Sequence, residues 1–106
     1  MTGMLTANTS LSAAGQNRPI VLVVEDDARL SSFLSRELAA VGYRVERIAD
    51  GGQALATFDL ISPDVVVLDL VLPGVDGLEL ARKLRAQSGV PILMLAARDG
   101  VDDRVP

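Results

Sequence analysis

Two short runs of aliphatic residues each end in carboxylates, and this pattern constrains the fold more than any other feature of the chain. The run Ile20–Val24 is followed by three acidic residues at 25–27, and the run 65–68 is followed by Asp69. Apolar runs of this length without polar alternation are typical of strands that are covered on both faces, as in a parallel sheet between layers of helices. The carboxyl edge of such a sheet is where ligands bind. We therefore expect the acidic residues to lie at a functional edge.

Segments with helical periodicity separate the strand-like runs. Apolar residues before Gly42 are spaced 3, 1, 4 and 3 positions apart, which puts them on one helical stripe and predicts an amphipathic helix that ends at this glycine. Residues 43–48 alternate more openly and predict a strand near the edge of the sheet. The apolar stripe of the helix consists of Leu30, Phe33, Leu34, Leu38 and Val41.

The same alternation continues through the second half of the chain. Asp50 and Gln53 have the spacing of a capping box, and they predict a helix that closes before Pro63. After it we expect, in order, the strand 65–68, a turn-rich loop at 72–77, a helix from residue 78 and a fourth strand over 90–95.

This order of elements predicts an α/β fold with a doubly wound parallel sheet, because short links between alternating strands and helices give right-handed crossovers. We expect a flavodoxin-like sheet of four strands in the order 2-1-3-4. In that order the first and third strands are neighbours. Glu25 and Asp26 would then meet Asp69 at the same edge.

Composition narrows the classes of function. The 106 residues carry a formal charge of −4 and include no histidine and no cysteine, so thiolate sites and histidine-based zinc sites are excluded. The acidic balance argues against direct binding of nucleic acid. No apolar stretch approaches the roughly 20 residues of a membrane span. We expect a cytoplasmic protein without membrane contact, with a disordered polar leader over residues 1–18 and one folded domain over residues 19–106.

The acidic residues have both a structural and a functional interpretation. Asp69 could be a turn residue after a strand, and residues 25–27 could start a helix with Asp27 as its N-cap. Burying several carboxylates together without a cation costs several kcal/mol each, as an order of magnitude, and Arg98 is one of the few cations that could serve. Both clusters at one edge therefore indicate a hard-metal site for Mg²⁺ around Asp69, which could act as a nucleophile.

Three segments together resemble the receiver domain of two-component response regulators. They are residues 23–27 (VVEDD), 67–77 (VLDLVLPGVDG) and 91–99 (PILMLAARD). The resemblance implies Mg²⁺-dependent transfer of a phosphoryl group from a histidine kinase onto Asp69. It further implies that Glu25, Asp26 and Asp69 hold the metal, together with the backbone carbonyl of Val71. Such a domain is a phosphoacceptor and not an enzyme in the ordinary sense.

The chain is also similar to receivers that precede a winged-helix DNA-binding domain, which implies a role in transcription control. Two departures from the family pattern bear on its activity. Ala96 stands where the family usually has threonine or serine. The chain stops at Pro106, before the fifth strand with its lysine and the last helix. We therefore expect a receiver that is truncated at its C-terminus and impaired in its response to phosphorylation.

Two other functions compete with this interpretation. The chain could be a receiver-like module that binds partners, or a second copy of itself, without phosphorylation. It could also be a Mg²⁺-dependent phosphohydrolase with an aspartate nucleophile. Such enzymes usually carry a second acid two residues after the nucleophile, and here that position is Val71.

Overall fold

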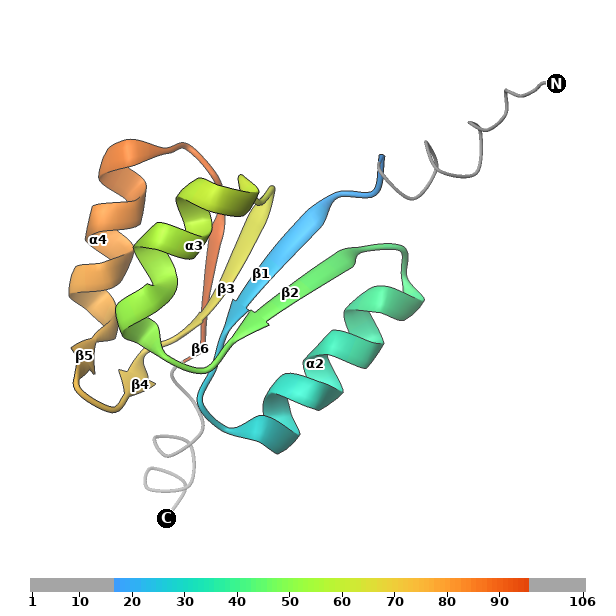
Figure 1. Ribbon diagram of the computed structural model, residues 1–106, viewed down its shortest axis with the longest axis horizontal. Coiled ribbons are helices and arrows are strands. Elements are labelled where there is room, and N and C mark those ends of the chain that lie inside the picture. Colours follow the sequence, from blue (N-terminus) through green and yellow to red (C-terminus); the bar gives the residue numbers. More distant parts are fainter. Residues whose placement is uncertain (1–16, 96–106) are drawn as a thin grey trace, which may run out of the picture.

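The computed structural model describes residues 17–95, and these form a parallel sheet with helices on both faces (Figure 1). The leader expected at residues 1–18 falls outside the described residues except for its last two positions, and so do Ala96 and Arg98. The elements are β1 (Ile20–Val24), α2 (Ala28–Ala40), β2 (Arg44–Ile48), the 3₁₀ turn η1 (Gly51–Gln53), α3 (Ala54–Ile61), β3 (Val65–Asp69), β4 (Val71–Leu72), β5 (Val75–Asp76), α4 (Gly77–Gln87) and β6 (Ile92–Leu95).

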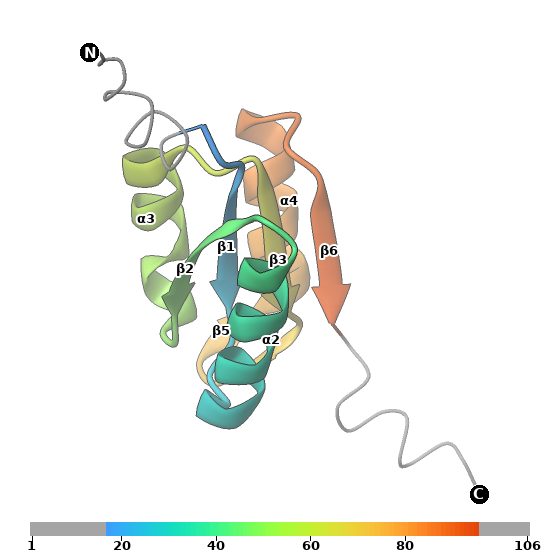
Figure 2. The ribbon, with the colours of Figure 1, turned by 90° about the vertical axis from the view of Figure 1, so that its right-hand side faces the viewer.

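The four main strands lie in the order β2-β1-β3-β6, and every neighbouring pair is parallel. This arrangement confirms the predicted order 2-1-3-4, with β6 as the fourth long strand. α3 and α4 cover one face of the sheet and α2 covers the other, as the two perpendicular views show (Figure 1, Figure 2). The doubly wound α/β architecture expected from the sequence is therefore present.

The core consists of two aliphatic clusters, one on each face of the sheet. The larger joins the sheet to α3 and α4, and the smaller lies under α2. β1 and β3 are the only strands in the described part of the chain that contribute fully buried residues to both clusters, as expected for strands at the centre of a covered parallel sheet. The buried residues of the larger cluster are Leu22, Val24, Ala54, Phe58, Val66, Leu68, Leu72, Leu80, Ala81 and Leu84, and those of the smaller are Val21, Val23 and Val67.

The structure corrects the sequence analysis at the first helix. α2 packs on the sheet through Leu34 and Leu38, whereas Phe33 and Val41 are exposed although they belong to the predicted apolar stripe. A single helix over a narrow sheet buries only a narrow stripe, and a residue one position away points about 100° around the helix axis. The predicted end of the helix is confirmed, because Gly42 adopts φ 106° after the helix.

Two further differences concern turns. Asp50 accepts a hydrogen bond from the Gly52 N–H and caps a 3₁₀ turn, which α3 then follows, so the predicted capping box does not start the α-helix directly. The loop expected at residues 72–77 contains the small antiparallel hairpin of β4 and β5. Of the helices within residues 17–95, none combines the length and hydrophobicity that a bilayer crossing requires.

Candidate functional site

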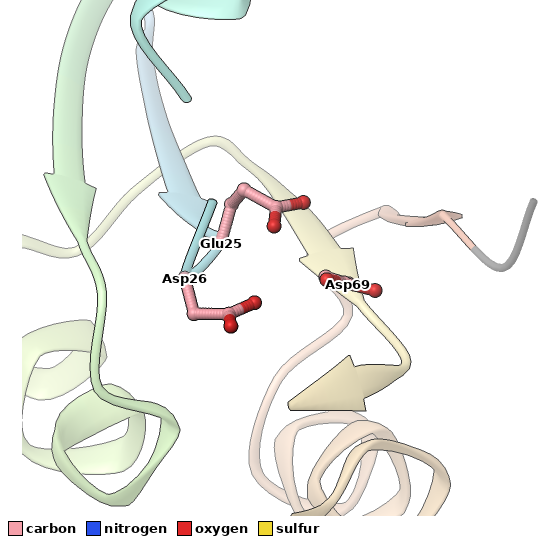
Figure 3. Close-up of side chains that lie close together, drawn as sticks. All are labelled: Glu25, Asp26 and Asp69. Carbon is pink, nitrogen blue, oxygen red and sulfur yellow. The ribbon is translucent and has the colours of Figure 1, made fainter. Parts of the chain in front are cut away.

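The two acidic clusters meet at the carboxyl edge of the sheet. β1 and β3 are hydrogen-bonded neighbours, with Val24 in register with Leu68, so the residues that follow them emerge side by side. Carboxylate oxygens of Glu25, Asp26 and Asp69 all lie within 4.8 Å of one another, and the three side chains converge on one space (Figure 3). The juxtaposition that the strand order predicted is therefore observed.

Backbone N–H groups orient two of these carboxylates. Glu25 Oε2 accepts a hydrogen bond from the Asp27 N–H at 2.9 Å, and Asp69 Oδ1 accepts one from the Val71 N–H at 2.9 Å. Glu25 and Asp69 are each 1% exposed, whereas Asp26 is more exposed. Two buried, fixed acids and one more accessible acid thus form the cluster.

Asp27 has a different function from its two acidic neighbours. Its Oδ1 accepts hydrogen bonds from the backbone N–H groups of Arg29 at 2.9 Å and Leu30 at 3.2 Å. These bonds satisfy two of the amide donors that a helix start leaves without intrahelical partners. The interpretation of Asp27 as an N-cap is confirmed, and among the described residues the metal-type cluster is made by the other acids.

A glycine that the sequence analysis did not single out holds the turn after Asp69. A Cβ atom on Gly77 would come within 2.5 Å of the Leu70 Cα and 2.7 Å of the Leu70 carbonyl oxygen. The start of α4 therefore packs directly against the backbone between Asp69 and Val71. The sequence feature that could have indicated this role is the position of Gly77 at the start of a helix, immediately after Asp76. A residue without a side chain there permits the close approach of another backbone segment.

A hollow of about 180 Å³ adjoins the acidic pair on the side of β2. Its lining residues are Glu25, Asp26, Ala28, Ser31, Arg47, Ile48 and Ala49. Ser31 and Arg47 were not among the residues selected from the sequence. The alternation of side chains along β2 could have placed Arg47 on one face, but the register of β2 against β1, which pairs Arg47 with Val23, is what brings it beside the acids.

The donor set suits a hard divalent cation. All three groups are carboxylates, which are the oxygen ligands that Mg²⁺ takes in proteins. Ligands of one Mg²⁺ lie at most about 4.2 Å apart, twice the Mg–O distance of about 2.1 Å. The 4.8 Å span therefore requires only a small adjustment or a water ligand, which Mg²⁺ commonly retains.

Comparison with protein families assigns the chain to a class. A family model described as "Response regulator receiver domain" matches residues 21–106. The chain therefore belongs to the receiver domain family of two-component response regulators, as the resemblance of its motifs predicted.

Relatives of this chain include regulators from mycobacteria. The chain is 49% identical over 86 residues to the "DNA-binding response regulator MtrA" of Mycobacterium tuberculosis (strain ATCC 25618 / H37Rv). The aligned segment covers 80% of this chain and 38% of that protein. The chain is 45% identical to the "Transcriptional regulatory protein TcrA" of the same strain, with 80% and 34% covered. The chain thus spans little more than a third of the length of these relatives.

Solved receiver structures have the same fold. The BeF3-activated N-terminal receiver domain of Klebsiella pneumoniae RstA matches with a TM-score of 0.72 at 31% identity, covering 81% of this chain and 74% of that chain. The response regulator TrrA of Thermotoga maritima, in complex with Mg²⁺ and a beryllium fluoride, matches with a TM-score of 0.71 at 31% identity, covering 82% and 76%.

Proposed function

We propose that this receiver domain accepts a phosphoryl group from a histidine kinase on Asp69, in a reaction that requires Mg²⁺. The observation that supports this most strongly is the burial of Asp69 at the end of the central strand β3, with carboxylate oxygens of Glu25 and Asp26 within 4.8 Å. Aspartate carboxylates are established covalent nucleophiles for phosphoryl groups. Membership of the receiver family supports the same assignment.

Each residue of the site has a defined part in this proposal. Asp69 attacks phosphorus, the bond from phosphorus to the donor nitrogen breaks, and an acyl phosphate forms on the carboxylate. The hydrogen bond from the Val71 N–H holds the Asp69 carboxylate in one orientation for this attack. Glu25, Asp26, Asp69 and the backbone carbonyl of Val71 would hold Mg²⁺. When bound, the ion offsets the negative charge of the carboxylates and the phosphoryl oxygens.

The test is chemical trapping of the acyl phosphate. Acetyl phosphate with Mg²⁺ should label the unsubstituted chain on Asp69, and borohydride reduction followed by peptide mapping should locate the label. Asp69→Asn should abolish labelling, because an amide oxygen is a poor nucleophile. Asp59→Asn is the matched control, since Asp59 lies exposed on α3 and the asparagine retains an oxygen for the Gln87 hydrogen bond. Wild-type labelling of Asp69→Asn would refute the assignment.

We further propose that phosphorylation changes the conformation of this domain less than in receivers with a hydroxyl at the position of Ala96. A charge-assisted hydrogen bond to the phosphoryl group, worth about 1.5–3 kcal/mol, is absent with alanine there. Amide spectra with and without a phosphoryl mimic should show only limited changes in the unsubstituted chain, and Ala96→Thr alone should not be sufficient to restore an extensive response. A large, long-range response in the unsubstituted chain would contradict this proposal.

The output of the signal is proposed from the relatives. Their names describe a DNA-binding response regulator and a transcriptional regulatory protein. We propose that a longer protein containing this domain controls transcription, with the receiver serving as its phosphoacceptor and not as its DNA-binding part. The net charge of −4 supports this division, because phosphate backbones are bound by basic surfaces.

A second candidate function is a non-phosphorylated module that dimerises or docks a partner. The open edge of β6 supports it, since Leu93 is 60% exposed and Met94 is 37% exposed on the outer strand of the described sheet. Binding that continues at full strength in Asp69→Asn and without Mg²⁺ would favour this function over the first.

A further inference from the structure

Arg47 occupies a defined place beside the acidic site. Arg47 lies on β2 and is in register with Val23 of β1, and Val23 stands two residues before Glu25. The Glu25 N–H donates a hydrogen bond to the Ile48 carbonyl at 3.0 Å, so the pairing of the two strands continues up to the acid. Side chains two residues apart on a strand share a face, and neighbouring strands are about 4.8 Å apart. Because Arg47 is in register with Val23, its side chain lies on the same face of the sheet as that of Val23, beside the strand that leads to the acids.

The hollow on this side brings the charges together. Among the described residues that line it, the charged ones are Glu25, Asp26 and Arg47, and α2 contributes two small side chains, Ala28 and Ser31. Ser31 is buried, so the hollow extends under the first turn of the helix. The small side chains leave space in which a guanidinium can approach the acidic pair.

Nearby acids on the same elements already have other contacts. Glu46, the neighbour of Arg47 on β2, forms an ion pair with Arg44 at 3.6 Å, and Asp27 caps α2. Neither this ion pair nor the Arg82–Glu79 pair on α4 involves Arg47. Arg47 is an exposed residue of β2, and Glu25 and Asp26 are the described acids that line the same hollow with it.

We propose that Arg47 sets the affinity of the acidic site for divalent cations. In the absence of a cation its positive charge offsets the mutual repulsion of the three carboxylates. When a cation binds, the same charge repels it, so Arg47 weakens binding. In this proposal Arg47 acts through its charge and is not a ligand of the cation. This inference rests on the proposed function only for the identity of the cation.

In the first arm of the test, Mg²⁺ is titrated into the protein and its binding is measured from the shifts of the Asp26 and Asp69 amide resonances. Arg47→Gln should bind Mg²⁺ about three- to tenfold more tightly, because a unit charge near the site contributes on this order at intermediate dielectric. Arg47→Lys retains the charge and should stay near the unsubstituted value. Arg36→Gln is the matched control, since it makes the same change in net charge at an exposed position of α2. The difference should shrink at about 1 M salt, where the screening length falls to about 3 Å.

The second arm uses metal-free protein and a double-mutant cycle. Arg47→Gln should lower the melting temperature in the unsubstituted background and have a smaller effect in the Asp26→Asn background, because part of the repulsion has gone. Equal behaviour of Arg47→Gln and Arg36→Gln in both arms would overturn the role of Arg47. If the unsubstituted chain shows no Mg²⁺-dependent change at Asp26 and Asp69, the metal site of the proposed function fails. The double-mutant cycle on metal-free protein then still tests whether the charge of Arg47 offsets the repulsion among the carboxylates.

Discussion

At the residue scale, adjacent acids with the same chemistry have different functions because of their backbone surroundings. Asp26 belongs to the carboxylate cluster, whereas Asp27 accepts hydrogen bonds from the N–H groups of Arg29 and Leu30 in the first turn of α2. We expect Asp26→Ala to weaken Mg²⁺ binding strongly with little loss of stability, because it also relieves repulsion. We expect Asp27→Ala to lower the free energy of unfolding by about 1 kcal/mol, the usual cost of losing an N-cap, with little effect on Mg²⁺.

Calorimetric titration and urea unfolding of both variants would measure these two quantities separately. Equal losses of Mg²⁺ affinity would mean that the acids act as a diffuse field and not as a site with specific ligands.

At the element scale, the site depends on how closely α4 approaches the turn after β3. Gly77 permits this approach, and the atoms that an added Cβ would meet belong to the Leu70 backbone, which cannot rotate away. We expect Gly77→Ala to lower the free energy of unfolding by about 1–3 kcal/mol, as overpacking does, and to shift the amide resonances of Asp69 and Val71.

The matched control is Gly89→Ala, because a Cβ on Gly89 meets nothing within 4 Å. Thermal unfolding should give the same melting temperature for Gly89→Ala and the unsubstituted chain. A Gly77→Ala variant that is equally stable and leaves the Asp69 resonance in place would show that α4 can withdraw without disturbing the site.

At the scale of the whole molecule, the described sheet has an apolar edge. β6 pairs with β3 on one side, and within residues 17–95 no strand pairs with its other side. Unpaired, apolar strand edges favour pairing with other chains. We expect the 106-residue chain to self-associate, with a sedimentation coefficient that rises with concentration, and Leu93→Lys to shift it toward monomer.

Leu60→Lys provides the control for this prediction. Leu60 is 83% exposed on α3, so the variant removes a comparable apolar side chain away from the edge. An equal effect of Leu60→Lys would place the contact on α3, and a chain that is monomeric at all concentrations would show that β6 does not recruit a partner.

Much of the architecture could be predicted because its causes are local. Apolar runs such as Ile20–Val24 are suited to a strand covered on both faces, and the positive φ of Gly42 marks the end of α2 as its sequence position indicated. The meeting of Glu25 with Asp69 was also predicted, because the flavodoxin-like strand order 2-1-3-4 makes the first and third strands neighbours. The identities of the individual metal ligands and of the phosphoacceptor remain predictions.

Other features depended on contacts between distant segments. The rotation of α2 about its axis leaves Phe33 exposed and Leu34 packed, because it is set by the sheet beneath the helix and not by the helix alone. The approach of Gly77 to Leu70 and the place of Arg47 beside Glu25 likewise arise from packing and strand register. The sequence by itself thus determined the long helices and strands, because these follow from local periodicity. Together with the strand order of a flavodoxin-like fold, it also determined the edge at which the acids gather. The tertiary structure alone decided which neighbours surround those acids, because that depends on how separate elements pack.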